Sequence, residues 1–382
     1  MRKKLLPLLS CPNDRSTSFK MYGVEVMRNG NLLKNIDHDG LLDEDDVKTG
    51  VVLAEGSNTA YPVSNYVGVI LSDADVDRGH HNTLLSPLKD NVPLLFNAAI
   101  TSTLNRIYGL GETQDGKWNR EEMKYYDEAV ETPEKQQAML KSIKEKNLWR
   151  IFIPRKKDMI DTISAACKGE WVLEIGCGNA RTIARIFHPQ ENGYSYLGTD
   201  ISFKRLEVAK QSLPGSDFLQ ASAFNLPLKK DAFNAAISFG MLHHLPRPAE
   251  AIIEVNKTLK HGGYFAFHEP VYTSRRFSEK QTAVVRKIFR TYEHSVHDNK
   301  IELNEAITCL KSLHHEVVKV VPYNSIFRVT FEAAMNRISR RWLTKKFPVK
   351  AMLKLDNVLL HTVVKLSNKL GPQAAVVVSQ KK

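Results

Sequence analysis

Short apolar runs alternate with helix-like segments in the second half of the chain. From residue 169 onward, these runs are separated by segments whose apolar positions recur every three or four residues. The alternation predicts a parallel sheet covered by helices on both faces, an α/β fold of the doubly wound type. The predicted strands span 171–175, 195–200, 217–220, 235–239 and 263–268, with two later ones at 316–321 and 374–378. The predicted helices include 180–188, 203–211 and 248–259.

The first 150 residues follow a different pattern. Residues 1–75 contain short β-prone stretches separated by turn residues, and the stretch from about 83 to 150 has helical character, with Thr132 as a helix N-cap. The apolar residues that follow Arg2 form too short a run for a signal peptide and are predicted as a first strand. We therefore expect a β module at 1–75, a helical linker at 76–150 and the α/β domain at 151–382.

Composition narrows the class of protein. The chain has 382 residues, 42% of them hydrophobic and 25% charged, which excludes disordered, collagen-like and coiled-coil classes. Four cysteines are too few for a disulfide scaffold, and no apolar run reaches the roughly 20 residues of a membrane-spanning helix. A cytoplasmic location is expected. The net charge of +12 is concentrated at the end of the chain, because basic residues outnumber acidic ones by 13 within 271–382.

A glycine turn after the first predicted α/β strand carries the candidate chemistry. Gly176 and Gly178 give the backbone freedom to approach a ligand closely, and Asp200 ends the next strand 22 residues after Gly178. This spacing is typical of nucleoside cofactor sites, where the carboxylate holds two ribose hydroxyls. A dinucleotide fingerprint needs a small residue where this chain has Arg181, which argues against NAD.

An ordered series of motifs extends this turn: Glu174-x-Gly-x-Gly, Gly198-Thr-Asp, Asn225-Leu-Pro, Ser238-Phe-Gly-Met-Leu-His-His-Leu and Leu259-Lys-His-Gly-Gly. The series, over roughly 145–270, resembles the class I S-adenosylmethionine-dependent methyltransferases, in particular the type 11-like group that acts on small molecules, quinones and lipids. The resemblance implies a seven-stranded Rossmann-like methyltransferase sheet with S-adenosyl-L-methionine as cofactor, and the two late strands fit the family's closing antiparallel pair.

The same resemblance implies roles for individual residues. Those that correspond to cofactor-binding positions are Glu174, Gly176 and Gly178 beside the methionine part, Asp200 at the ribose, Ile201 at the adenine, and Phe239 and Gly240 in the pocket wall. Ser222 stands where the family often has an acidic residue that reads the adenine amino group, so altered adenine contacts are expected.

A hydroxyl or carbon acceptor also needs a base to remove its proton. Candidates at the ends of the fourth and fifth strands are His243, His244, His268 and Glu269. Tyr125 and Tyr126, in a helix before the sheet, are candidates to line the acceptor site. The histidine pairs at 80–81 and 314–315 lack companion ligands, so no metal site is predicted.

The N-terminal β module resembles a small zinc ribbon. In that pattern each half carries two cysteines, and the four positions here are Cys11, Asp14, Ala54 and Ser57. Three ligands are missing, so a metal-free module is expected that packs against the domain or shapes the acceptor site.

A basic, amphipathic insertion is predicted at about 323–372, between the two late strands. Its run 337–350 holds six basic residues and no acid, and an apolar stripe at helical spacing follows. Such a helical insertion suits a cap over the acceptor site, peripheral contact with an anionic membrane, or nucleic-acid phosphates.

The sequence therefore predicts methyl transfer from S-adenosyl-L-methionine to a small-molecule or lipid-like acceptor. An RNA methyltransferase is the first alternative, favoured by the basic C-terminal region. The end of the fourth predicted strand argues against this alternative, because it lacks the Asn/Asp-Pro-Pro-aromatic sequence of methylases that act on base amino groups. A non-catalytic cofactor-binding scaffold is the second alternative.

Overall fold

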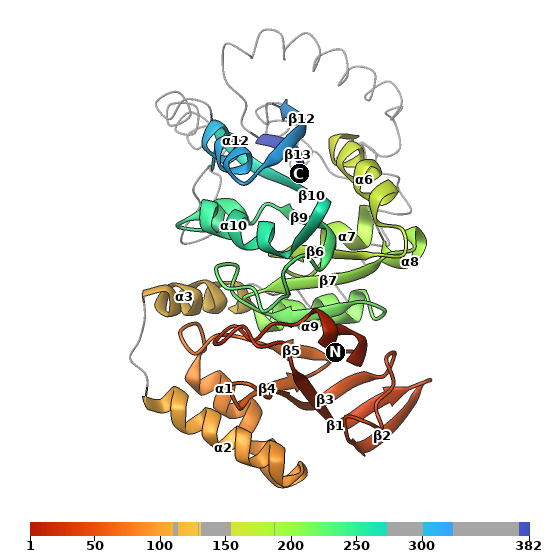
Figure 1. Ribbon diagram of the computed structural model, residues 1–382, viewed down its shortest axis with the longest axis vertical. Coiled ribbons are helices and arrows are strands. Elements are labelled where there is room, and N and C mark those ends of the chain that lie inside the picture. Colours follow the sequence, from red (N-terminus) through yellow and green to blue (C-terminus); the bar gives the residue numbers. More distant parts are fainter. Residues whose placement is uncertain (110–113, 129, 131–153, 187, 273–300, 324–373) are drawn as a thin grey trace, which may run out of the picture.

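The computed structural model describes residues 1–109, 114–128, 130, 154–186, 188–272, 301–323 and 374–382 (Figure 1). The predicted basic insertion, including 337–350, lies outside the described residues. So does all of 131–153, where Thr132 was expected to cap a helix.

The second half of the chain forms the predicted doubly wound sheet. Its strands are β6 (Trp171–Ile175), β7 (Ser195–Asp200), β8 (Asp217–Gln220), β9 (Phe233–Phe239), β10 (Leu259–Tyr272), β12 (His315–Tyr323) and β13 (Ala374–Lys381). They lie side by side in the order β12-β13-β10-β9-β6-β7-β8, and β13 is antiparallel to both neighbours. A short strand, β11 (Ile301–Glu302), pairs with β10. The predicted seven-stranded Rossmann-like arrangement is thus confirmed.

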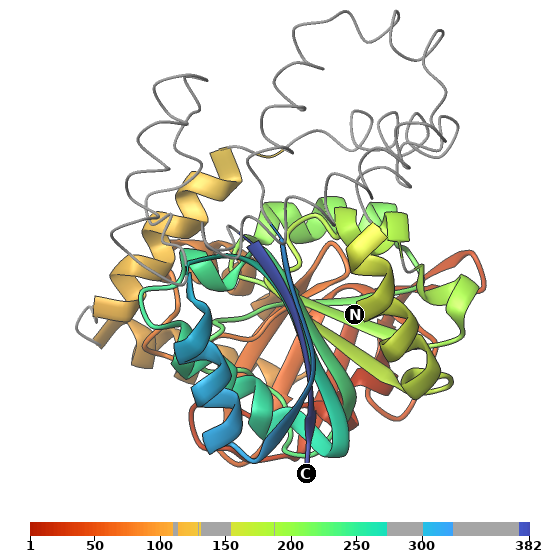
Figure 2. The ribbon, with the colours of Figure 1, turned by 90° about the horizontal axis from the view of Figure 1, so that it is seen from above.

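Helices cover both faces of this sheet (Figure 2). One apolar core includes side chains of α10 (Pro248–Thr258) and α12 (Leu303–Ser312). The other includes side chains of α6 (Pro154–Cys167), α7 (Arg181–Ile186) and α9 (Phe203–Ser212). A one-turn helix, α8 (Pro189–Asn192), leads into β7. Central strands such as β6 are buried on both faces, which is why they are almost wholly apolar.

The N-terminal strands continue the same sheet. They are β1 (Phe19–Arg28), β2 (Asn31–Ile36), β3 (Asp46–Ala54), β4 (Thr59–Ser64) and β5 (Val67–Val69). They pair antiparallel with one another, and β5 then pairs parallel with β8 through Gly68 with Leu219 and Val69 with Gln220. The β5–β8 pairing removes an exposed sheet edge.

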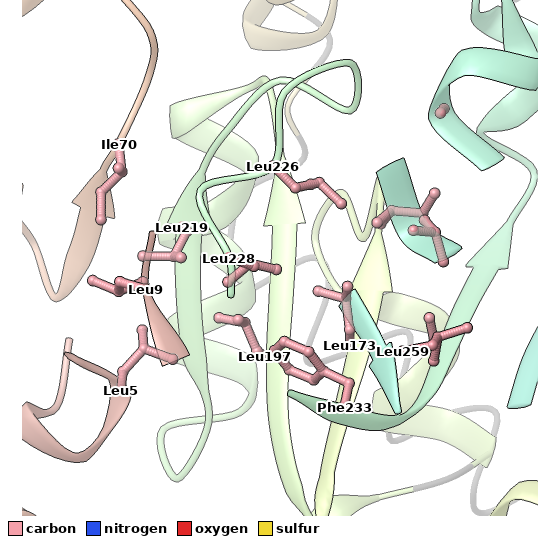
Figure 3. Close-up of a cluster of buried hydrophobic side chains, with 14 of the residues drawn as sticks. Leu5, Leu9, Ile70, Leu173, Leu197, Leu219, Leu226, Leu228, Phe233 and Leu259 are labelled. Carbon is pink, nitrogen blue, oxygen red and sulfur yellow. The ribbon is translucent and has the colours of Figure 1, made fainter. Parts of the chain in front are cut away.

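The segment predicted as a first strand is instead a 3-10 helix, η1 (Lys3–Leu8). Pro7 lacks the backbone N–H that a strand ladder needs, which disfavours the predicted strand. The helical turn also places Leu5 and Leu9 in the core, where both are fully buried beside Leu219 and Leu228 (Figure 3). The apolar spacing was therefore that of a helix.

Buried ion pairs hold the N-terminal part against the α/β part. The Arg2 guanidinium donates to Asp217 Oδ2 at 2.7 and 3.0 Å, and the Arg2 N–H donates to Oδ1 at 3.0 Å. Asp217 is fully buried in β8. Lys210 of α9 pairs with Asp46 of β3 at 2.6 Å. We call these contacts the seam.

The possible ligands of the zinc-ribbon resemblance do not gather into a metal site among the described residues. Cys11 is buried, with its Sγ 3.3 Å from the Tyr61 hydroxyl and 3.4 Å from the Ser57 hydroxyl. The ribbon resemblance stays a hypothesis.

Helices follow the N-terminal strands, as predicted: α1 (Arg78–Leu85), η2 (Ser86–Asn91), α2 (Leu94–Gly109) and α3 (Gln114–Glu128). Of these, α3 packs against α9 and so reaches the carboxyl-end edge of the parallel strands. Among the described residues, no helix has the length and apolar character needed to cross a bilayer.

Candidate functional site

The turn after β6 has an unusual backbone. Gly176 and Gly178 have φ angles of +63° and +53°, and Ala180 follows with +52°. A Cβ atom on Gly176 would lie 2.0 Å from Cγ of Met241, so only glycine fits at this position. Ala180 lies in the left-handed region, which is why α7 begins at Arg181, one residue later than predicted.

Asp200 links this turn to the end of β7. Its Oδ2 accepts the N–H of Gly178 at 2.7 Å and its Oδ1 accepts the N–H of Ser202 at 2.9 Å. The residue is only 8% exposed, and burial raises the pKa of its carboxyl despite the opposing charge of Arg205. Each oxygen keeps acceptor capacity beyond its one backbone hydrogen bond.

A cavity of about 510 Å³ opens above the turn, a size usual for small-molecule and cofactor sites. Seven of the eight predicted cofactor-binding residues line it: Glu174, Gly176, Gly178, Asp200, Ile201, Phe239 and Gly240. Ser222 is not among the lining residues, although its neighbours Ala221 and Ala223 are. The Ser222 hydroxyl instead accepts the N–H of Phe224 at 3.3 Å, within its own turn.

Glu174 is held in place from the strand beside it. The Tyr196 hydroxyl on β7 donates to Glu174 Oε2 at 2.5 Å, and the Thr199 hydroxyl donates to the Glu174 backbone oxygen at 3.2 Å. Burial, with the Glu174 charge beside it, raises the pKa of Tyr196 well above its usual range, so the phenol stays a donor. Glu174 is 2% exposed and lines the cavity.

The four predicted base candidates occupy different places. His244, in the short helix η3 (Leu242–His244), lines the cavity and packs against Tyr126 at 5.8 Å between ring centroids. His243 Nδ1 contacts Glu269 Oε2 at 2.8 Å, and both residues are buried. The His268 backbone oxygen accepts the N–H of Gly240 at 2.9 Å. Only His244 of these four is a cavity-lining residue.

Glu269 organises the loop after β9. Its Oε1 accepts the N–H groups of Met241 and Leu242 at 3.0 and 3.1 Å and the Ser238 hydroxyl at 3.2 Å. Its Oε2 also accepts the His243 N–H at 3.4 Å. This carboxylate therefore fixes the loop that presents Met241 and His244 to the cavity.

The other wall of the cavity comes from α3, outside the motif series. Tyr125 and Tyr126 line it, as predicted, and Trp118, Asn119 and Glu122 do so as well. Trp118, Asn119 and Glu122 were not predicted from the sequence. One face of α3 carries residues 118, 122 and 125–126. The sequence pattern that could have indicated Glu122 is therefore an acidic residue among aromatic residues at helical spacing.

Comparison with known proteins places this site in a recognised domain. Residues 173–267 match the family model described as a methyltransferase domain. A phthiotriol/phenolphthiotriol dimycocerosates methyltransferase of Mycobacterium tuberculosis is 33% identical over 104 residues, 26% of this chain and 37% of that protein. A fatty-acid O-methyltransferase of Mycolicibacterium smegmatis is 32% identical over 108 residues, 27% of this chain and 38% of that protein. The chain thus spans less than two fifths of the length of these relatives.

Solved structures show only a distant likeness. Geranyl diphosphate C-methyltransferase of Streptomyces coelicolor A3(2) is 11% identical with a TM-score of 0.42, covering 59% of this chain and 75% of that one. Phosphoethanolamine N-methyltransferase 2 of Haemonchus contortus is 16% identical with a TM-score of 0.41, covering 60% of this chain and 52% of that one. These low scores carry no argument about activity. By its match to the family model and its strand order, the segment 173–267 is a methyltransferase domain, and the predicted resemblance is confirmed there.

Proposed function

We propose that this chain transfers a methyl group from S-adenosyl-L-methionine to a small-molecule or lipid-like acceptor. The observation that carries the proposal is the cavity at the glycine turn, where the buried Asp200 carboxylate keeps free acceptor capacity within a methyltransferase domain. The acceptor class is supported by a relative that is named a fatty-acid O-methyltransferase.

The residues present fit the cofactor. Asp200 would bind ribose hydroxyls, while Glu174 and the turn at Gly176 would border the methionine part. A side chain on Gly176 would clash with Met241, so this position of the turn requires glycine. Bound there, the cofactor would supply a methyl group already activated by the positive charge on sulfur. The protein's task is then to hold the acceptor in line with that methyl group and to exclude water.

Removal of the acceptor proton is assigned to His244. It lines the cavity on the loop after β9, and an imidazole titrates near neutral pH. The buried contact between His243 and Glu269 gives these two residues a positioning role, because it holds that loop without facing the cavity. His268 contributes its backbone oxygen to the same loop.

Calorimetric titration of the full chain with S-adenosyl-L-methionine tests the proposal first. We expect saturable binding that Asp200→Ala abolishes, while the exposed control Asp161→Ala on α6 binds as the wild type does. Absence of binding by the wild type would refute the proposal.

A labelled-methyl assay then tests the acceptor. We expect transfer to a component of a lipid or small-molecule extract and none to RNA. Transfer to RNA alone would establish the first alternative function, and binding without transfer to any fraction would favour the scaffold. Peripheral contact with an anionic membrane through 337–350 stays a sequence-based hypothesis, because that run lies outside the described residues.

A further inference from the structure

Glu122 of α3 is a buried acid for which the described residues supply no hydrogen-bond partner. It is 1% exposed, and neither carboxylate oxygen has a hydrogen-bond partner among the described residues. Other polar side chains on the helix are engaged: Asn119 donates to Asp75 at 2.7 Å, and Asp127 accepts the Ser202 hydroxyl at 2.5 Å. A buried carboxylate left in this state is costly, so a ligand that satisfies it gains binding free energy.

Aromatic contacts fix Glu122 within the cavity wall. One turn before it, Trp118 packs against Phe224 at 5.7 Å between ring centroids. One turn after it, Tyr126 packs against His244 and lies under the Arg205 guanidinium, 4.3 Å from its central carbon. All of these α3 residues line the cavity, so the carboxylate of Glu122 sits on a wall held at both ends.

Asp200, which also lines the cavity, is the charged group that acts most on Glu122. Burial, then the Asp200 charge and then that of Glu121 raise the pKa of the Glu122 carboxyl to about 7. The other titratable or charged residues that line the cavity, from the elements around it, are Glu174 on β6, Cys177 in the turn, Arg181 on α7, Arg205 on α9, His244 on η3, and Tyr125 and Tyr126 on α3 itself. None of these is among the groups that shift Glu122.

Two carboxylates that line one cavity select the chemistry of the ligand group that binds both. Each oxygen of Asp200 already accepts one backbone N–H, whereas both oxygens of Glu122 are open. A ligand group that carries neighbouring hydrogen-bond donors and no negative charge satisfies both acids. Two adjacent hydroxyls on a sugar ring have these properties.

We infer that Glu122 is a further ligand-binding residue of this site and shares the sugar hydroxyls of the nucleoside part with Asp200. The inference rests on the proposed function, which places a nucleoside cofactor in the cavity. It extends the site beyond the segment 173–267 to a helix from the N-terminal half of the chain.

Proton linkage gives this inference a signature that a purely structural role lacks. A carboxylate that accepts hydrogen bonds from the ligand is favoured in its ionised form, so binding lowers the pKa of Glu122. Near pH 7 the wild type should therefore release a proton on binding, and its affinity should rise by about tenfold between pH 6 and pH 8. Asp200 titrates as well, so the signature is the difference between the wild type and a Glu122 variant.

Calorimetric titration of the full chain with S-adenosyl-L-homocysteine, which has no methyl group to transfer, measures these quantities. We expect Glu122→Gln to bind 10- to 100-fold more weakly at pH 8 and to lose both the rise in affinity and the proton release, measured in two buffers of different ionisation enthalpy. Glu128→Gln removes an exposed charge from the same helix, one that is not among the groups that shift Glu122, and should behave as the wild type.

A ligand that lacks one ribose hydroxyl identifies the group that is bound. The 2′- or 3′-deoxy analogue of S-adenosyl-L-homocysteine should lose at least fivefold more affinity for the wild type than for Glu122→Gln. Equal losses for both proteins, or unchanged binding and pH dependence in Glu122→Gln, would overturn the inference while the proposed function stands. Failure of the wild type to bind S-adenosyl-L-homocysteine would instead overturn the proposed function.

Discussion

Two groups of buried acids in the described part of the chain, one at the seam and one in the cavity, have opposite hydrogen-bonding environments. At the seam, Asp217 is surrounded by donors from Arg2, at 2.7 to 3.0 Å. In the cavity, Glu122 has no partner among the described residues, and Asp200 has only one backbone N–H on each oxygen. All three acids are buried, since Asp217, Glu122 and Asp200 are each less than 10% exposed.

This difference separates a structural site from a binding site. Burial of a carboxylate costs several kcal/mol unless partners replace its water. At the seam the fold itself supplies the partners, so the charge contributes to holding the two halves together. In the cavity, the described residues leave acceptor positions on the Glu122 and Asp200 carboxylates unfilled. A ligand can therefore form hydrogen bonds there. Removal of a seam acid should therefore affect folding, and removal of a cavity acid should affect binding.

The largest effect is expected from Asp217→Asn. This change leaves the Arg2 guanidinium buried with a neutral partner, which should lower the free energy of unfolding by about 3 kcal/mol. Urea unfolding monitored by circular dichroism measures the loss. Glu44→Gln is the matched control, because Glu44 also pairs with Arg2, at 3.2 Å, but its side chain is 70% exposed. That variant should stay within about 0.5 kcal/mol of the wild type. Similar losses in both variants would contradict the comparison.

Asp200→Asn should weaken cofactor binding more than it lowers the free energy of unfolding. Its unfolding free energy should fall less than that of Asp217→Asn. Burial already disfavours the Asp200 charge and raises its pKa, so the main cost is the amide group that meets one of the two backbone N–H groups. Its affinity for S-adenosyl-L-methionine should fall by about 2–3 kcal/mol, roughly 30- to 150-fold, because hydrogen bonds to a charged acceptor are replaced. Calorimetry and urea unfolding on the same protein separate the two quantities. A large loss of stability with binding retained would place Asp200 with the seam acids.

The pH dependence of stability gives a third test, through Glu122. Its pKa rises from about 4.5 in the unfolded chain to about 7 in the folded protein, so the folded state holds the extra proton between these values. Stability from this group is therefore full below pH 4.5 and is lost as the pH rises through 7. At about 1.4 kcal/mol per pKa unit, a rise of roughly 2.5 units corresponds to a loss on the order of 3 kcal/mol over the whole range.

Unfolding of Glu122→Gln isolates this contribution. Urea midpoints at pH 5 and pH 8 should differ less in the variant than in the wild type, and the variant should be the more stable protein at pH 8. A seam-like, satisfied acid would give the opposite sign, with stability rising as it ionises. The same variant should bind the cofactor less well, so the gain in stability and the loss of binding go together.

The sequence predicted the α/β half of the molecule far better than the N-terminal half. The bounds of β6, β7 and β8 agree with the prediction residue for residue, because apolar runs buried on both faces leave little ambiguity. The segment that became η1 was mistaken for a strand, because a run as short as Leu5 to Leu9 fits either period. Nothing local in β5 shows that it will pair with β8, since the pairing depends on two segments 150 residues apart.

The sequence predicted the part of the site that lies within the motif series, but not the part contributed by α3. Gly176, Gly178 and Asp200 follow from a turn and a spacing within one domain, and all three line the cavity. Ser222 failed to do so because its hydroxyl is used by the N–H of Phe224, a local contact that a motif cannot show. Glu122 was missed because its role depends on α3 packing over the cavity from outside the motif series.

Glu269 sharpens the comparison, because it borders the cavity region yet is satisfied like a seam acid. Five contacts surround its fully buried carboxylate, four from the loop after β9 and one from Ser238 at the end of β9. Glu269→Gln keeps one acceptor oxygen but turns an amide group toward backbone N–H groups, which should displace the loop that carries His244. We expect kcat to fall by about tenfold, or ~1.4 kcal/mol, with cofactor affinity within threefold of the wild type.

The role of Glu269 is tested by comparing how Glu269→Gln changes kcat and how it changes cofactor affinity. Steady-state methyl transfer gives kcat, and calorimetry with S-adenosyl-L-homocysteine gives affinity. His244→Gln should lower kcat at least as much, and the double variant should lose less than the product of the two single losses, because both changes act on one loop. Independent losses would mean that Glu269 acts apart from His244. A main effect on cofactor affinity would instead group Glu269 with Asp200 and Glu122, and satisfaction by the fold would no longer distinguish the two kinds of buried acid.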